Sequence, residues 1–333
     1  MNNVNLDKLV LVNLDIDIWS GQAKLQPSDL KGIDTSDLPP ETLASLGSKR
    51  ICSKEHLKVF NKLKARAVRA VLEHGRPFIG GYAYPSKYTD KLEAKLIQIE
   101  QEYLAARQQF LKIYEDAVQC WMDDNPKYSD AIKRGALERD EVGERLNFGF
   151  QIIAISPIQS PEAQKRLDVR IKGVGDELVD EIADKANEFL DKYLVGQEAV
   201  STQTKRSLVN MRDKVRGLAF LNRKLAPMGQ LLDDMILAYG AYAGKKHVEG
   251  DGYFQILAST LVLSNREKLT QYIAGELDLG AMTQKLMPGD SSPATNTDTA
   301  REQSSESESE SASELETNED EDEGNDSSEG MYF

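Results

Sequence analysis

Two acidic residues near the N-terminus have the type and spacing that a metal site could use. Asp15 and Asp17 alternate with apolar residues in a segment, residues 9–19, whose period of two is typical of a half-buried strand. Two carboxylates on one strand face could ligate a divalent cation, and such a cation would then raise the melting temperature. The alternative, which we favour, is a solvated outer face of an edge strand.

Other residues that commonly carry chemistry are scattered. The three histidines, His56, His74 and His247, are isolated in the sequence, and the two cysteines, Cys52 and Cys120, are far apart. No zinc-protease, paired-cysteine or nucleophile-elbow pattern is present. We therefore expect no enzyme, no cofactor and no metal, and we expect Cys120 to be a buried thiol on a helix.

A loop at residues 76–86 combines two glycines with flanking aromatic residues. The glycines permit a positive φ or a close backbone approach, but the dinucleotide-binding fingerprint is missing. A structural role and a partner-binding role both remain open. The candidate partner-binding residues in this loop are Phe78, Gly80, Gly81, Tyr82 and Tyr84.

Two predicted helices have a basic side. In the helix over residues 55–74 this side carries Lys58, Lys62, Lys64, Arg66 and Arg69, and we interpret it as a solvated face. The helix over residues 204–225 has the densest patch and could bind nucleic acid phosphates or an acidic segment of the chain itself. Its candidate nucleic-acid-binding residues are Lys205, Arg206, Arg212, Lys214, Arg216, Arg223 and Lys224.

The C-terminal segment, residues 288–333, is a polyanion. It holds 15 of the 55 acidic residues and one of the 41 basic residues, so it carries the whole net charge of −14 and the remainder is neutral. Its Ser, Glu and Asp content predicts disorder. Its apolar end, Met331, Tyr332 and Phe333, resembles the tail of bacterial single-stranded-DNA-binding proteins, which docks into basic pockets on partners. That resemblance implies a partner-binding end, and a solubilising tail is the alternative.

One long helix would position much of the remaining chain. Apolar or small residues recur at steps of four and three over residues 91–121, which is the rhythm of a coiled-coil seam. The seam could pack within one chain or between two. Its members are Leu92, Leu96, Ile99, Tyr103, Ala106, Phe110, Ile113, Ala117 and Cys120.

We predict a mainly α (α+β) fold: an elongated helical bundle or coiled-coil hairpin with a small antiparallel β element and a disordered acidic tail. The long helix should pack antiparallel on the helix at 55–74, and a strand at 147–156 should pair with residues 9–19. Further helices are predicted from about Asp176 to Tyr193, over 204–225, and at 227–242, 253–263 and 266–277. The predicted regions are an N-terminal α+β region, 1–157, a C-terminal helical region, 158–287, and the tail, 288–333.

The N-terminus lacks the basic start of a secretory signal, and no apolar run is long enough to span a membrane. We therefore expect a cytoplasmic protein.

Four segments together resemble a family of unknown function from bacterial mobile elements and phages. They are Leu14–Gly21, Leu46–Lys49, Phe78–Pro85 and Phe148–Gln151, and the resemblance extends over about residues 8–280. Members are often encoded near MoxR-type or CobS-like ATPases. The resemblance implies a bacterial cytoplasmic protein of a mobile element, and it supplies no catalytic residues.

From the sequence alone we favour a non-catalytic interaction or adaptor protein, with a MoxR-type AAA+ ATPase as the partner that the resemblance suggests. The alternative is a nucleic-acid-associated protein that uses the basic helix 204–225, with the acidic tail as an internal competitor. Membrane binding is not expected, and the heptad helix makes an oligomer conceivable.

Overall fold

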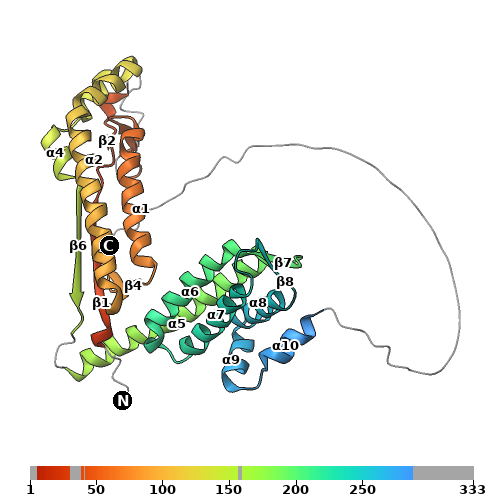
Figure 1. Ribbon diagram of the computed structural model, residues 1–333. Coiled ribbons are helices and arrows are strands. Elements are labelled where there is room, and N and C mark those ends of the chain that lie inside the picture. Colours follow the sequence, from red (N-terminus) through yellow and green to blue (C-terminus); the bar gives the residue numbers. More distant parts are fainter. Residues whose placement is uncertain (1–5, 31–38, 41, 157–159, 288–333) are drawn as a thin grey trace, which may run out of the picture. The chain divides into compact units, whose positions relative to one another are not determined.

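The computed structural model describes residues 6–30, 39–40, 42–156 and 160–287 (Figure 1). The described residues all belong to one compact unit. The described part is mainly helical, at 67%, with small antiparallel sheets, so the predicted α+β class is correct. Among its helices, none combines the length and apolar character needed to cross a bilayer.

The described strands and helices alternate in the N-terminal half, and helices dominate the second half. In chain order they are β1 (Leu9–Asp17), β2 (Gln22–Lys24), β3 (Ser48–Arg50), α1 (Lys58–Leu72), β4 (Arg76–Phe78), β5 (Gly81–Pro85), α2 (Thr89–Asp124), α3 (Ser129–Gly135), α4 (Arg139–Glu144), β6 (Asn147–Ala154), α5 (Pro161–Tyr193), β7 (Ala199–Ser201), α6 (Lys205–Leu218), α7 (Leu225–Gly240), β8 (His247–Glu249), α8 (Gly250–Leu263), α9 (Arg266–Ala274) and α10 (Leu279–Leu286).

The main sheet has four antiparallel strands in the order β4-β5-β1-β6. The predicted pairing of the first strand with the strand near residue 150 is confirmed, and its register runs from Val10↔Ala154 to Asp17↔Asn147. The alternation in β1 buries Val12 and Ile16, because period-two residues share one face of a sheet. Two further pairs, β2-β3 and β7-β8, form small separate sheets.

The long helix α2 packs antiparallel on α1. The ion pairs Arg66–Glu102 and Lys95–Glu73 fix this direction, because the residue number rises on one helix as it falls on the other. The buried ring of Phe60 on α1 contacts Tyr103 on α2. The seam of α2 therefore packs largely inside the chain.

Beyond Phe110 the seam prediction is correct at Ala117 and wrong at Ile113 and Cys120. Ile113 is nearly half exposed and Cys120 is exposed, so the expected buried thiol at Cys120 is wrong. Tyr114 and Val118 are buried in their place. A straight helix has 3.6 residues per turn, so positions that repeat every seven residues rotate around the helix by about 20° per repeat. After several repeats the position that faces the core is therefore one residue later than the heptad predicts.

Two cores fill the described unit. One holds side chains of β1, β6, α1 and α2, and the other joins helices α5 to α9 to Leu9, Phe78 and Ala83 of the sheet. Several predicted boundaries in the second half are wrong. The helix expected from Asp176 starts at Pro161, and α10 was not predicted. The helix expected over 204–225 ends at Leu218, and α7 begins at Leu225.

Candidate functional site: a basic cleft

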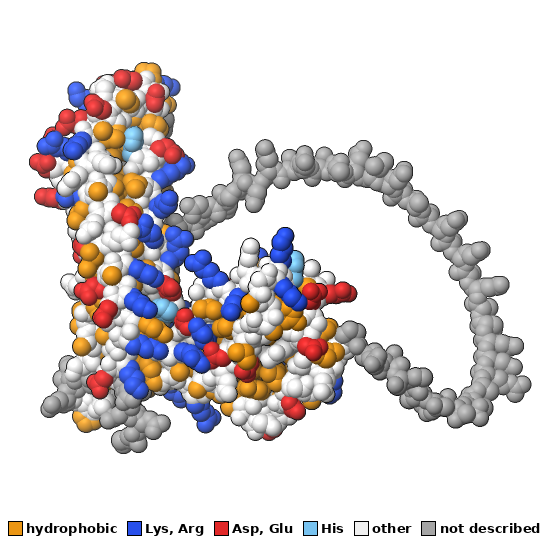
Figure 2. Space-filling model, viewed as in Figure 1, with side chains coloured by type: hydrophobic (Ala, Val, Ile, Leu, Met, Phe, Trp, Pro, Cys, Tyr) orange, Lys and Arg blue, Asp and Glu red, His pale blue; other side chains and the backbone are white. Residues whose placement is uncertain are grey.

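A cleft of about 820 Å³ lies among α1, α2, α5 and α6. Six Lys or Arg residues and one acidic residue, Glu73, line it. This imbalance is notable because residues 1–287 are neutral as a whole. Figure 2 shows Lys and Arg side chains gathered along one side of the α1–α2 pair. The basic residues of the cleft are Arg66, Arg69, Lys95, Lys185, Arg206 and Lys214.

Helix α1 forms one wall of the cleft, and the spacing of its arginines places them on that wall. Arg66 and Arg69 are three residues apart, so they lie on one side of the helix. That side faces α2, where Arg66 donates two hydrogen bonds to the carboxylate of Glu102, at 2.7 and 2.5 Å. Lys95 on α2 in turn donates to Glu73 at 2.6 Å. These two ion pairs hold the wall in place and neutralise part of its charge.

Two arginines of the cleft keep their full charge. Arg69 and Arg206 are both exposed, and in the described part of the chain neither has a carboxylate within 4 Å. The pKa of Glu73 is lowered chiefly by its hydrogen bond from Lys95, against the effect of burial, and the nearby charge of Arg206 adds to the decrease. Arg69 and Arg206 are therefore the residues best placed to meet an anion.

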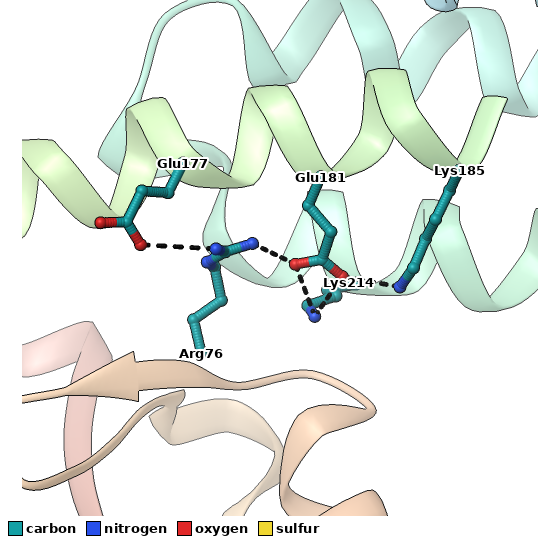
Figure 3. Close-up of polar contacts among 5 residues, drawn as sticks. All are labelled: Arg76, Glu177, Glu181, Lys185 and Lys214. Atoms are coloured by element: carbon teal, nitrogen blue, oxygen red, sulfur yellow. Dashed lines mark hydrogen bonds and ion pairs between the residues drawn. The ribbon is translucent and has the colours of Figure 1, made fainter. Parts of the chain in front are cut away.

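An ion-pair cluster around the buried Lys214 adjoins the cleft at α5 and α6 (Figure 3), and its members Lys185 and Lys214 line the cleft. The Nζ atom of Lys214, whose side chain is 5% exposed, donates to both oxygens of Glu181 at 2.7 and 3.0 Å. Lys185 donates to Glu181 at 2.6 Å, and Arg76 of β4 bridges Glu181 and Glu177. Burial raises the pKa of Glu181, but its hydrogen bonds from Lys185 and Lys214 outweigh that effect and leave it lowered. This cluster joins β4, α5 and α6, so we assign it a structural role.

The structure does not gather the seven basic residues predicted over 204–225 into one surface. Lys214 is buried against Glu181, and Arg212 and Arg216 form ion pairs with Asp233 of α7. Arg223 and Lys224 lie beyond the end of α6 and do not line the cleft, and Lys205 does not line it either. Only Arg206 and Lys214 of the predicted patch belong to the cleft.

The cleft residues on α1 were visible in the sequence, but nothing there indicated a cleft. Arg66 and Arg69 belong to the basic side of the 55–74 helix, which we expected to be a solvated face, and Arg69 and the three lysines of that side are exposed. Lys95 and Lys185 gave no distinct signal. The four residues come together only through the packing of α1 and α2 near α5 and α6, and the linear pattern does not encode that packing.

The aromatic loop is a β-hairpin formed by β4 and β5, and it is only partly available to a partner. Phe78 and Tyr84, predicted as partner-binding residues, are buried, so they stabilise the core and do not contact a partner directly. Gly80 completes the turn, Gly81 begins β5, and Tyr82 is partly exposed. The turn residue missed by the sequence analysis is Ile79, which is 53% exposed and has a φ of 44°.

The remaining predicted positions add no site. Asp15 and Asp17 are exposed on the outer face of β1, but β1 lies between β5 and β6 and is not the edge strand that we expected. Among the described residues, no group of three or more His, Cys, Asp or Glu side chains could hold a metal ion. Met331, Tyr332 and Phe333 lie outside the described residues.

Comparison with known proteins gives one match. A family model described as a protein of unknown function (DUF3150) matches residues 6–265. No curated protein and no solved structure matches the chain.

Proposed function

This chain belongs to the DUF3150 family, whose function is unknown. From the site itself we propose that it is a non-catalytic binding protein. In this proposal the basic cleft holds the phosphate backbone of a single-stranded nucleic acid. The observation that carries the proposal is the lining of the cleft, with six basic residues against one acidic residue. Guanidinium groups match phosphate oxygens in a bidentate geometry, and the cleft offers two arginines that have no carboxylate partner among the described residues, Arg69 and Arg206.

The size and lining of the cleft favour a single strand bound without sequence preference. A volume of about 820 Å³ is in the range of small-ligand pockets, so it suits a few nucleotides and not a duplex. Among the described residues that line it, none is aromatic, so bases have no platform for stacking. Contacts to phosphate alone carry no sequence information. The sequence alone favours an adaptor, and the cleft changes that preference.

The proposal is tested by anisotropy titration of a labelled oligothymidine with the full chain and with the double variant Arg69→Glu/Arg206→Glu. We expect the double variant to lose affinity at least tenfold, because two attractive contacts become repulsive. Both residues are exposed, so folding should not change. The matched control is Arg223→Glu/Lys224→Glu, which makes the same charge change outside the cleft. Equal losses in the two double variants would contradict the proposal.

The acidic segment 288–333 gives a second prediction from the same assay. It carries the same sign of charge as the ligand, and removing it changes the net charge of the chain from −14 to zero. We therefore expect a chain ending at Met287 to bind the oligonucleotide more tightly than the full chain, most clearly at low salt. Equal affinity would refute the internal-competitor hypothesis and leave the cleft proposal unaffected.

A protein partner is the second candidate function, and Ile79 is the observation that favours it. A β-branched residue with positive φ is strained, and this one is exposed at the tip of a hairpin. Strain that persists at an exposed position points to a role in binding. The MoxR-type ATPase and the mobile-element context rest on the family resemblance and remain proposals.

Replacing Ile79 by Asn should stabilise the protein by about 1 kcal/mol, because Asn tolerates the left-handed conformation and Asn-Gly is the preferred two-residue hairpin turn. Urea unfolding measures the change. Val195→Asn is the control, since Val195 is also an exposed turn residue but does not have a positive φ. A destabilised Ile79→Asn protein would show that Ile79 contributes to packing and would remove the reason for a partner site there.

A further inference from the structure

The outer edge of strand β6 is unpaired in the described part of the chain. β6 is the last strand in the order β4-β5-β1-β6, and its described partner is β1 alone. In Figure 1 it has α2 on one side and no other described helix or strand along its outer edge. In an antiparallel strand, the backbone N–H and C=O groups of alternate residues point toward the two neighbouring strand positions in the sheet. Where one of these positions is empty, the groups on that edge have no strand partner.

Strand β6 lacks the features that usually keep an edge strand from pairing. Its eight residues, Asn147–Ala154, include no charged residue and no proline. The register with β1 is continuous from Val10↔Ala154 to Asp17↔Asn147, so no bulge interrupts the strand. Natural edges normally carry lysine, proline or a bulge, or are very short. The opposite edge of the same sheet is protected in this way, since β4 has only three residues and contains Pro77.

Helix α2, which packs against β6, carries an apolar stripe. Ile97 and Leu104 are one heptad apart and are 41% and 40% exposed. Leu111 continues the same side of the helix and packs close to Gly143 of α4, the helix that leads into β6. Along β6 itself, Phe150 and Ile152 are partly exposed on the face that packs on the α1–α2 core. Ile153, which is 46% exposed, points to the opposite face of the sheet. The backbone hydrogen-bonding groups of the edge are therefore flanked by apolar side chains on both faces.

We propose that this edge pairs with the β6 edge of a second copy of the chain, antiparallel and about a twofold axis normal to the sheet. The strand suits its own copy, because an uncharged segment meets no like charge across the axis. A twofold axis normal to the sheet leaves the core-facing side of both copies on the same side of the joint sheet. Side chains that pair across the axis therefore lie on the same face, so even-numbered residues pair with even-numbered residues. In a register centred on residue 150 or 151, Ile152 then faces Phe148 or Phe150, and aromatic–β-branched pairs of this kind stabilise sheets.

The pairing closes at a dimer with one continuous sheet. Each copy uses the one long unprotected edge that its described residues offer, so only the short, proline-containing β4 edge of this sheet remains. The inference is independent of the basic cleft, whose lining includes no residue of β6.

Sedimentation velocity of the full chain over a wide concentration range tests the dimer. We expect a monomer–dimer equilibrium that Gln151→Lys abolishes, because Gln151 lies at the axis or next to it in both registers and two lysines would then repel. The matched control is Asn13→Lys. Asn13 is the register partner of Gln151 on β1, is also exposed, and lies one strand away from the edge.

The expected result is a dimer for the unchanged chain and for Asn13→Lys, and a monomer for Gln151→Lys, with equal melting temperatures for the two variants. A monomer at every concentration would overturn the proposal. A dimer that Gln151→Lys leaves intact would also overturn it, as would assembly beyond the dimer. If the Gln151→Lys protein has a lower melting temperature than the Asn13→Lys protein, Gln151→Glu is measured in its place. The same outcomes then support or overturn the proposal.

Discussion

Replacing Glu181 by Gln is expected to lower the free energy of unfolding by about 3 to 5 kcal/mol, the typical cost of removing one partner from a buried ion pair. The carboxylate of Glu181 accepts hydrogen bonds from Lys214 and Lys185 and is paired with Arg76. Lys214 has almost no contact with solvent, so its charge would remain buried without a counter-ion. Urea unfolding followed by circular dichroism measures the change.

Two further variants separate charge loss from other effects. Glu177→Gln removes a carboxylate from the same helix, but Glu177 is 59% exposed and contacts Arg76 at 3.4 Å, so we expect a change below about 1 kcal/mol. Adding Lys214→Met to Glu181→Gln should recover part of the loss, since the uncompensated charge is then gone. If Glu181→Gln lowers the free energy of unfolding no more than Glu177→Gln does, the cluster does not hold α5 and α6 together.

The cluster also predicts an acid dependence. The folded-state pKa of Glu181 is lowered, so its stabilisation is fully present above its ordinary value of 4.5 and is lost as the pH falls through the folded-state pKa. The Glu181→Gln protein should therefore lose less stability than the unchanged chain when the pH falls below about 4.5. A parallel loss in both proteins would assign the acid dependence to other carboxylates.

Replacing Asp29 by Asn is expected to destabilise the protein by about 3 kcal/mol. The side chain of Asp29 is only 1% exposed. It accepts hydrogen bonds from the backbone N–H of Gln26 at 2.9 Å, from Lys49 at 2.5 Å and from Arg134 at 2.6 Å. Asn would leave both cations without their counter-ion, and Lys49 belongs to the short β2–β3 sheet, so this end of the fold should loosen first.

The pH dependence identifies Asp29 as the source of this effect. Burial raises the pKa of Asp29, but its hydrogen bonds from Lys49, Gln26 and Arg134 lower it to about 2. Since the ordinary value is 3.8, the contribution of Asp29 is complete above about pH 4 and disappears toward pH 2. The control is Asp140→Asn, because Asp140 is 93% exposed and should contribute little. Equal stability changes at the two positions would contradict the assignment.

Strand and helix types were predictable where the apolar pattern has one clear period. The alternation over 9–19 predicts β1 and its inward residues, and the four-and-three rhythm predicts the long helix and the burial of Leu92 through Phe110. The predicted start of α5 near Asp176 was wrong, and two glycines, Gly173 and Gly175, come just before that position. Both lie inside the helix, and a Cβ at Gly175 would come within 2.9 Å of the Leu221 carbonyl oxygen. The second glycine is therefore needed for close packing.

The candidate site was less predictable, because its charges depend on partners distant in sequence. The linear density of basic residues favours 204–225, yet Asp233 and Glu181 neutralise its centre. Arg69 and Arg206 have no carboxylate partner among the residues that the structure describes, and they lie in the same cleft, although 137 positions separate them in the numbering. A pattern within one helix cannot show which of its Lys and Arg side chains form ion pairs with carboxylates of other helices.

The most direct test of phosphate binding in the cleft is the salt dependence of oligothymidine affinity for Arg69→Ala/Arg206→Ala beside Arg223→Ala/Lys224→Ala. Each phosphate contact to a single strand contributes about 0.7 to the slope of log affinity against log salt concentration. The cleft variant should therefore have a slope shallower by about 1.4 than the unchanged chain, while the control keeps the original slope. Equal slopes for the two variants, or no salt dependence in the unchanged chain, would contradict nucleic acid binding in the cleft.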